Sequence, residues 1–216
     1  MLAHVLVEYF HKGGPIMWPM LFVLFLSLAV IIDRSIWWIS LSSKIQPQLQ
    51  EEARNLLGKG DFQRAIDACA QQADPFLYNL HTGLMHASSS PLAAMQLHAS
   101  NLVEKSESRL WVLSTVITLA PLIGLLGTVV GIMGSFNFIG DQALAVTKVT
   151  GGIAEALIAT AVGLGIAILC LLPFNFFRKK TSLLRSKLEY WINHAEILAA
   201  NAKNHGKDWS DFTPKA

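Results

Sequence analysis

The stretch LWVLSTVITLAPLIGLLGTVVGIMGSFNFI, residues 110–139, is thirty residues long and contains no charge. A second apolar stretch, VTGGIAEALIATAVGLGIAILCLLPFNFF at residues 149–177, contains one charge, Glu155. A third, IMWPMLFVLFLSLAVII at residues 16–32, lies near the N-terminus. A helix needs about 20 apolar residues to cross the hydrocarbon core of a bilayer, with a range of roughly 17 to 25. The sequence therefore predicts three transmembrane helices.

The composition of the whole chain agrees with this interpretation. Hydrophobic residues make up 52% of the 216 residues, charged residues make up 15%, and the mean hydropathy is +0.42. Ordinary soluble domains are about 25% charged, so this chain has too little polar surface to coat a soluble body. A net charge of +2 is too small to suggest a nucleic-acid binder, and two distant cysteines give no disulfide framework. We expect an all-α integral membrane protein with long helical cytoplasmic extensions.

The charges outside the spans predict the orientation. Residues 178–216 contain eight Lys or Arg residues against four acids, so this tail should be cytoplasmic by the positive-inside rule. With three spans, the N-terminus is then periplasmic. The expected segments are a periplasmic N-terminus with a possible interfacial helix (1–15), transmembrane helices (16–32, 110–139 and 149–177), a helical cytoplasmic loop (33–109), a periplasmic loop (140–148) and a basic helical tail (178–216).

Within the cytoplasmic loop, helix starts are expected at Asp61, at Asp74-Pro75 and at Ser90-Pro91, because Asp and Ser cap helices and Pro suits the first turn. We expect the last of these helices to continue without interruption through residue 139, with a kink at Pro121. Pro173 is expected to kink the third span for the same reason.

Small residues recur at helical spacing in both long spans, and they predict close helix packing. The glycines of this kind are Gly124, Gly127, Gly131, Gly134, Gly152 and Gly163. Small residues let helix backbones approach each other in a membrane. These stripes are longer than one three-helix monomer should bury, so they predict a homo-oligomer.

Two threonines lie at matched distances from the outer ends of their spans. Thr128 precedes residue 139 by eleven residues, and Thr160 follows residue 149 by eleven. Both hydroxyls should then lie at one depth, where they could line a polar track in a ring of subunits. Alternatively, each hydroxyl donates to a carbonyl three or four residues back in its own helix.

Glu155 is the only ionisable residue between Lys148 and Arg178. A carboxylate inside a membrane is costly unless it is paired, protonated or hydrated, and such residues usually mark an ion path. The alternative is a protonated carboxyl bonded to a neighbouring helix. Glu155 and Thr160 are about 140° apart around a helix, so they cannot share one face. Because the spans contain no basic residue for Glu155, the sequence suggests an oligomeric shell around a partner.

No Walker loop, Rossmann glycine pattern or nucleophile elbow occurs in the sequence. His81, His86 and His98 lack the i, i+4 spacing that places two metal ligands on one helix face. We therefore expect no catalytic residue, no metal site and no cofactor.

Two of the stretches, APLIGLLGTVVGIMGSF at residues 120–136 and GGIAEALIATAVGLGIAI at residues 151–168, resemble the paired signatures of the MotA/TolQ/ExbB proton-channel family. KGGPIMWPMLFVLFLSLAVIIDR at residues 12–34 resembles the first span of ExbB-like members. The resemblance covers all three spans, about half of the chain, whereas the cytoplasmic loop matches only in length and helical character. The three-span layout favours the ExbB/TolQ branch over the four-span MotA branch, and the Gly-Pro sequence before the first span favours ExbB.

The resemblance implies a homopentamer in the bacterial inner membrane that encloses two helices of an ExbD/TolR-like one-span subunit. Thr128 and Thr160 match the family's pore-lining threonines, and Glu155 matches its third-span glutamate. Proton flow would drive work on a TonB- or TolA-like protein, for outer-membrane import in the first case and envelope maintenance in the second. The rival interpretation is a non-conducting membrane scaffold that gathers partner helices.

Overall fold

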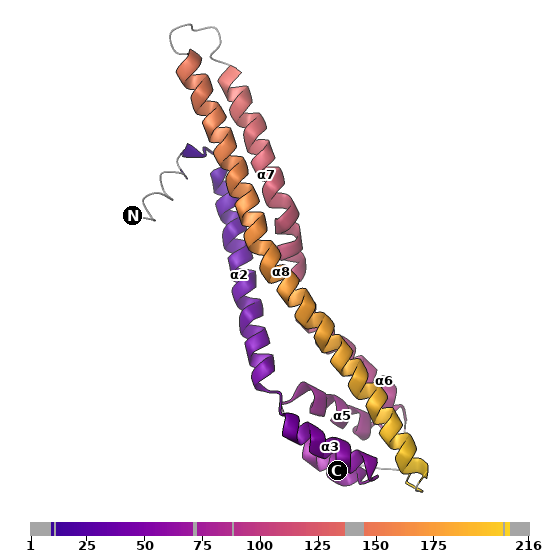
Figure 1. The fold of residues 1–216 in the computed structure, drawn as a ribbon. Helices are drawn as coiled ribbons and strands as arrows, with labels where there is room; N and C mark the ends of the chain where they lie inside the picture. Colours follow the sequence, from indigo (N-terminus) through magenta and orange to yellow (C-terminus); the bar gives the residue numbers. More distant parts are fainter. Residues whose placement is uncertain are drawn as a thin grey trace. The chain divides into compact units, whose positions relative to one another are not determined.

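The computed structural model describes residues 10, 12–70, 73–87, 89–136, 145–204 and 206–207, and these residues are helical or lie in turns, without a strand. Figure 1 shows the helices in chain order. They are α2 (Met17–Ser43), α3 (Pro47–Gly58), α4 (Phe62–Cys69), α5 (Pro75–Met85), α6 (Pro91–Glu107), α7 (Leu110–Phe136) and α8 (Ala145–Asn204). Residues 1–9 and 11, which contain most of the expected interfacial helix, and most of the loop at 140–148 lie outside the described residues.

The chain divides into two compact units, which we call the apolar unit and the polar unit. The apolar unit comprises Met1–Asp33 and Arg109–Phe177, and the polar unit comprises Arg34–Ser108 and Arg178–Ala216. Helices α2 and α8 therefore contribute residues to both units. Every division between the units falls beside a charged residue, where the apolar stretches of the sequence end.

The apolar unit contains the apolar parts of α2, α7 and α8. All three helices are long and apolar enough to cross a membrane. The chain is therefore an all-α, multi-pass membrane protein, as the sequence predicts. Its core is built from large residues of α2 and small or medium residues of α7 and α8: Met17, Met20, Val23, Val116, Ala120, Ala159, Ile166 and Cys170.

The prediction of one uninterrupted helix from residue 91 to residue 139 is wrong. α6 ends at Glu107, Ser108 has an extended ψ of 134°, and Arg109 has a φ of 64° before α7 begins. A left-handed conformation costs a non-glycine residue roughly 1–2 kcal/mol. The Arg109 guanidinium donates to the Asp33 carboxylate on α2 over 2.6 Å, and such a half-exposed ion pair offsets up to about 1 kcal/mol of that cost. No Gly or Pro marks the break in the sequence.

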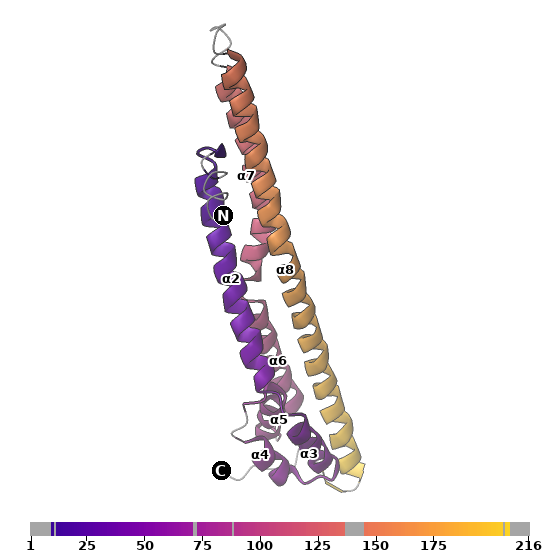
Figure 2. The ribbon, with the colours of Figure 1, turned by 60° about the vertical axis from the view of Figure 1, so that its left-hand side comes forward.

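In the polar unit, the three predicted helix starts are confirmed, with Asp61, Asp74 and Ser90 as N-caps of α4, α5 and α6. Asp74 is fully buried and accepts four hydrogen bonds. Two come from the backbone N–H groups of Phe76 and Leu77, which begin α5, and two come from the Gln46 backbone N–H and the Gln50 amide at the start of α3. One carboxylate thus caps α5 and ties it to α3, where α3, α4 and α5 pack together (Figure 2).

Within the same unit, α6 packs against the C-terminal part of α8. The Ser106 hydroxyl lies 3.1 Å from the Thr181 hydroxyl in a buried contact, and Arg185 pairs with Glu107 at 3.2 Å. Leu188, Trp191, Ile192, Ala195 and Ala199 are buried on one side of α8. Trp191 stacks on Phe76 and receives the Arg54 guanidinium over its ring, so α8 also packs against α3 and α5.

Candidate functional site

The site lies in the apolar unit, where α7 and α8 pack as antiparallel helices through their small residues. A Cβ added to Gly124 would lie 3.0 Å from the Thr160 Cα, and one added to Gly131 would lie 3.0 Å from the Gly152 carbonyl oxygen. A Cβ on Gly163 would lie 2.5 Å from the Ala120 carbonyl oxygen. At Gly163 a side chain would force the backbone to shift, and at Gly124 and Gly131 it would be tighter than most real Cβ contacts. The glycines therefore allow the two backbones to touch.

The expectation that the glycine stripes are longer than one chain can bury is wrong. Gly124, Gly127, Gly131, Gly152 and Gly163 all pack against residues of their own chain, so one chain does bury most of the two stripes. Gly134 differs, because nothing lies within 4 Å of a Cβ added there. Contacts between copies of the chain would therefore have to use other surfaces.

Large apolar side chains on the outer faces of the helices supply such surfaces. Those exposed by half or more of their area in the apolar unit include Phe22, Phe25, Leu122, Leu125, Met133, Leu157, Ile168 and Leu172. A membrane protein presents such side chains to lipid or to other transmembrane helices. The faces are consistent with either environment.

Thr160 makes a contact that neither of its two sequence interpretations includes. Its hydroxyl donates across the interface to the Gly124 carbonyl of α7 over 3.0 Å. The absence of a side chain on Gly124 gives the hydroxyl access to that carbonyl. Thr160 therefore joins the two helices by a hydrogen bond at a point of close backbone approach.

Thr128 follows the second interpretation, because its hydroxyl donates to the Leu125 carbonyl of its own helix over 2.6 Å. Since Gly124 lies opposite Thr160, Thr128 lies four residues further along α7. Four residues of helix correspond to roughly 6 Å. The two hydroxyls are thus within about one helical turn of a common depth, and only that of Thr160 is bonded between helices.

Glu155 faces a different neighbour, the turn that leads into α2. We call residues 13–16 the GGPI turn. The φ of Gly14 is 69°, and the position of its missing side chain is occupied by the Glu155 carboxylate. The Gly14 carbonyl accepts from the Met17 backbone N–H over 3.1 Å, which fixes the turn at the start of α2. Ile16 of the same turn packs on Gly127.

The electrostatic setting of Glu155 is unusual for a membrane segment. Its side chain is half-buried, and within the described part of the chain no hydrogen bond or ion pair joins its carboxylate to another group. An unpaired carboxylate within an apolar segment is costly, so such residues are rare in membrane helices. Thr160 faces α7 whereas Glu155 faces the GGPI turn, so the two polar groups lie on different sides of α8, as their separation in sequence predicts.

Reasoning from the sequence misses the position of the GGPI turn beside Glu155. In the sequence, Gly-Pro before the first span serves only to favour the ExbB branch. A positive φ at Gly14 and the approach of its backbone to a carboxylate both require glycine. The signal was present in the residue type, but no pattern in the sequence indicates that Glu155, 141 residues away, is the neighbour.

The two predicted kink residues lie inside helices that continue past them, Pro121 in α7 and Pro173 in α8. Proline has no N–H, so Pro121 leaves the Ile117 carbonyl without its helical partner. Pro121 directly follows Ala120, whose carbonyl lies against Gly163. The helix bend at either proline stays a prediction.

The polar unit contains two histidines that share an aromatic neighbour. His81 on α5 and His98 on α6 flank the ring of Tyr78, and burial lowers the pKa of both imidazoles, with Lys105 adding to the effect at His98. Burial, and secondarily Asp74, raises the pKa of the Cys69 thiol to about 12, so it stays protonated. Within the part of the chain that the structure describes, no three His, Cys, Asp or Glu side chains form a group that could hold a metal.

Comparison with known proteins adds independent findings. A family model described as the MotA/TolQ/ExbB proton channel family matches residues 71–190. The putative biopolymer transport protein ExbB-like 3 of Synechocystis sp. is 32% identical over 173 residues, which cover 77% of this chain and 81% of the relative.

Relatives with two different names match a shorter part of the chain. The Tol-Pal system protein TolQ of Pseudomonas aeruginosa is 44% identical over 92 residues, covering 42% of this chain and 40% of the relative. The biopolymer transport protein ExbB of Aquifex aeolicus is 41% identical over 93 residues, covering 43% of this chain and 61% of the relative.

Proposed function

Because the chain belongs to the MotA/TolQ/ExbB proton channel family, we propose that it is the pore-forming subunit of an ExbB/TolQ-type motor. Such a subunit converts the proton motive force into mechanical work on a periplasmic partner. The proposed location is the bacterial inner membrane, with the N-terminus periplasmic and the basic C-terminal tail cytoplasmic. The proposed ion is H⁺, and no cofactor is needed.

The observation that carries this proposal is the environment of Glu155. The Glu155 carboxylate is half-buried in an apolar unit and has no bond to the described residues. Such a group destabilises a membrane protein, so its presence suggests a functional role. The GGPI turn packs on both Glu155 of α8 and Gly127 of α7, so residues before α2 and residues of both long helices lie near the carboxylate. In this proposal Glu155 exchanges charge along the ion path, and Thr128 and Thr160 line the pore.

The assembly we propose is a homopentamer around an ExbD/TolR-like one-span subunit, with a TonB- or TolA-like protein as the load. The exposed apolar faces of α2, α7 and α8 supply the surfaces that such a ring needs. TonB-dependent outer-membrane import is the preferred load. A TolQ-type role in envelope maintenance is the alternative, supported by the TolQ relative, whose identity over its matched segment is similar to that of the ExbB relative.

A non-conducting scaffold is the competing proposal from another class. It explains the glycine contacts between α7 and α8 equally well, since those contacts are structural. It gives no reason for a carboxylate at Glu155, because a scaffold made of apolar residues would be more stable in a bilayer.

Proton flux into vesicles tests the proposal. The full chain is co-reconstituted with an ExbD/TolR-like one-span protein from the same organism, and acidification is followed with an enclosed pH-sensitive dye. We expect flux from the parent, little flux from Glu155→Gln, which cannot ionise, and partial flux from Glu155→Asp, which ionises with a shorter reach. Assembly of each variant is checked by native mass spectrometry.

Full flux from Glu155→Gln would remove Glu155 from the ion path. If Gln is tolerated and Asp is harmful, Glu155 is a packing residue that makes a neutral hydrogen bond. Absence of flux from the assembled parent complex would favour the scaffold.

A further inference from the structure

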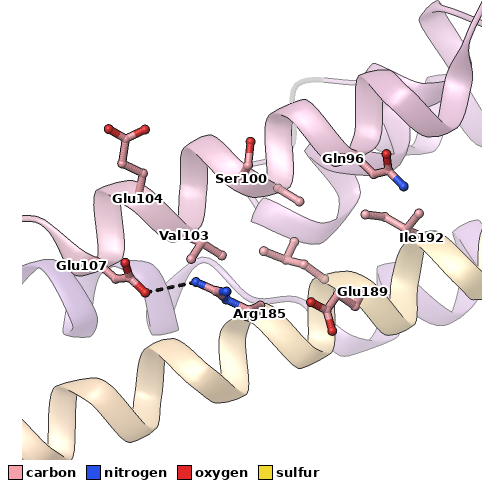
Figure 3. Close-up of a pocket in the computed structure, with 10 residues that line it drawn as sticks. Gln96, Ser100, Val103, Glu104, Glu107, Arg185, Glu189 and Ile192 are labelled. Atoms are coloured by element: carbon pink, nitrogen blue, oxygen red, sulfur yellow. Dashed lines mark hydrogen bonds and ion pairs between the residues drawn. The ribbon is translucent and has the colours of Figure 1, made fainter.

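The polar unit contains a groove that the ion path does not use. It is a cavity of about 440 Å³ between α6 and the C-terminal part of α8. Its floor consists of the buried apolar residues Ala99, Val103, Leu188 and Ile192. Figure 3 shows Val103 and Ile192 in the space between the two helices, with Glu107 and Arg185 joined at one end.

The rim of this groove is acidic. Glu104, Glu107 and Glu189 line it together with one base, Arg185. Arg185 pairs with Glu107 at 3.2 Å, so that acid is compensated. Within the described residues no ion pair involves Glu104 or Glu189. The groove therefore has an apolar floor and two further acids at its edges, Glu189 on α8 and Glu104 on α6, whose carboxylate points away from α8 in Figure 3.

A complementary surface lies on the same helix. Leu183, Lys187, Tyr190, His194 and Ile197 follow one another at spacings of four, three, four and three residues, so they form one stripe along α8. We call this set the outer stripe. Its large apolar members are exposed by 51% (Leu183), 54% (Tyr190) and 57% (Ile197). These three side chains lie seven residues apart along one line of the helix, so they give α8 an exposed face with apolar groups spaced by two turns.

The outer stripe and the groove lie on opposite sides of α8. Leu188 lies in the groove floor, and Tyr190 follows it by two residues, a rotation of about 200°. The two surfaces of one chain consequently cannot meet each other. Two different surfaces on opposite sides of a subunit are what a head-to-tail contact requires, and such contacts generate rings when the rotation closes.

We propose that the outer stripe of one copy of this chain docks into the α6–α8 groove of a second copy. The occupant is a second copy because this chain itself carries the complementary surface, with apolar side chains for the floor and Lys187 for the acidic rim. The proposal deepens the proposed function, since it rests on the ring and places one subunit contact in the polar unit.

Residues of the outer stripe and residues of the groove lie at matching positions along the axis of α8. The Arg185–Glu107 pair fixes the antiparallel register of α8 and α6, so residue 104 lies opposite about residue 188, and residue 100 lies opposite about residue 192. In a ring whose axis runs along α8, equal residues of neighbouring copies have equal heights. Lys187 of one copy then lies level with Glu104 and Glu189 of the next, and Tyr190 lies near the level of Ser100.

Cysteine cross-linking of the full-length chain in membranes tests this contact. The pair Tyr190→Cys and Ser100→Cys, placed in one chain, is oxidised with copper phenanthroline. We expect a ladder of disulfide-linked oligomers, because each copy contributes one cysteine to each of two contacts. Asn101→Cys replaces Ser100→Cys in the matched control, since Asn101 is exposed on the same helix but outside the groove. The native Cys69 and Cys170 are both buried.

Equal ladders from the Ser100 and Asn101 variants, or no ladder from either, would overturn the proposal. Efficient dimerisation of Tyr190→Cys alone would do so too, because it would mean that stripe meets stripe about a two-fold axis. Proton flux measured on the unmodified complex separates the two proposals. Flux without the specific ladder leaves the motor intact and removes this contact, whereas the ladder without flux leaves the contact and removes the motor.

A charge exchange sharpens the test. Lys187→Glu should lower the yield of the Tyr190–Ser100 disulfide by roughly two- to fivefold, the effect of an exposed ion pair. Adding Glu104→Lys and Glu189→Lys to the same chain should restore the yield. A Lys187→Glu variant with unchanged yield, or a triple variant without recovery, would show that Lys187 does not meet this rim.

Discussion

Helix α8 packs in two different ways in the two units that it joins. In the apolar unit it meets α7 through Gly152, Gly163 and Thr160, and the backbones touch. In the polar unit its contacts with α6, α5 and α3 use large side chains such as Leu188 and Trp191, and an ion pair crosses the contact with α6. One helix thus changes its packing residues where it changes units.

The difference follows from the solvent on each side. In water, burying apolar area stabilises a contact by about 25 cal/mol per Å², so large side chains are favoured. In a bilayer the lipid tails are as apolar as the side chains, and association depends on close packing and hydrogen bonds between helices. Glycine therefore stabilises helix packing in the apolar unit, and large side chains such as tryptophan stabilise it in the polar unit.

The largest expected effect is the enlargement of a glycine in the apolar unit. Gly163→Leu would place a side chain where the Ala120 carbonyl oxygen lies 2.5 Å from the added Cβ. We expect the α7–α8 contact to separate and folded protein to be lost, because backbone cannot move aside as a flexible side chain can. The yield of monodisperse protein in detergent measures this.

Gly165→Leu is the matched control, since Gly165 lies two residues along the same helix with nothing within 4 Å of an added Cβ. Comparable loss of folded protein in both variants would show that the membrane tolerates neither leucine, and that close backbone approach is not the reason.

In the polar unit we expect the largest loss of stability from shortening a buried large side chain. Leu84 on α5 is completely buried, and Leu84→Ala should destabilise the protein by about 2–5 kcal/mol through lost burial and the remaining cavity. The neighbouring Met85 is 45% exposed, so Met85→Ala should cost well under half as much. Thermal unfolding followed by tryptophan fluorescence compares the two. Equal shifts in Tm would mean that the polar unit is not held by its apolar core.

Much of this contrast could be predicted from the sequence. The uncharged stretches predict the spans, and the caps at Asp61 and Asp74 predict helix starts, because both signals are local. The break at Arg109 could not be predicted, since it depends on a residue in left-handed conformation and on Asp33, 76 residues away. No glycine or proline is present there to signal it.

The candidate site was predictable only in part. Glu155 is conspicuous because an isolated carboxylate in an apolar stretch is costly. The partners of Glu155 and Thr160 were not predictable, because a rotation of about 100° per residue describes one helix and does not say which helix faces it. Gly14 and the Gly124 carbonyl are neighbours that only the folded chain provides.

A smaller effect is expected at the GGPI turn. Gly14→Ala adds a Cβ at a φ of 69° and pushes the Glu155 carboxylate aside. The backbone cost is roughly 1–2 kcal/mol, so the protein should still fold. We expect reduced proton flux, because the carboxylate is displaced from its position. Gly151→Ala, in open helix, is the control and should leave the flux unchanged. If Gly14→Ala lowers only the yield of protein, the turn is structural.

The smallest effect concerns the two threonine hydroxyls, and it tests whether contacts between helices matter more than contacts within one. Thr160→Val keeps the shape of the side chain and removes the hydrogen bond to the Gly124 carbonyl, whereas Thr128→Val removes a bond to its own helix. Hydrogen bonds between transmembrane helices contribute on average about 0.6 kcal/mol and at most about 1.7 kcal/mol. Thr160→Val should therefore lower the free energy of unfolding by roughly that amount, and Thr128→Val by less, because the carbonyl at Leu125 remains bonded within the helix.

Unfolding of the two reconstituted variants by a denaturing detergent measures the difference in their stability. If both hydroxyls line the proposed pore, each variant should also reduce proton flux while the ring remains assembled. A larger loss of stability in Thr128→Val than in Thr160→Val would contradict the assignment of Thr160 as the bond that joins α7 to α8.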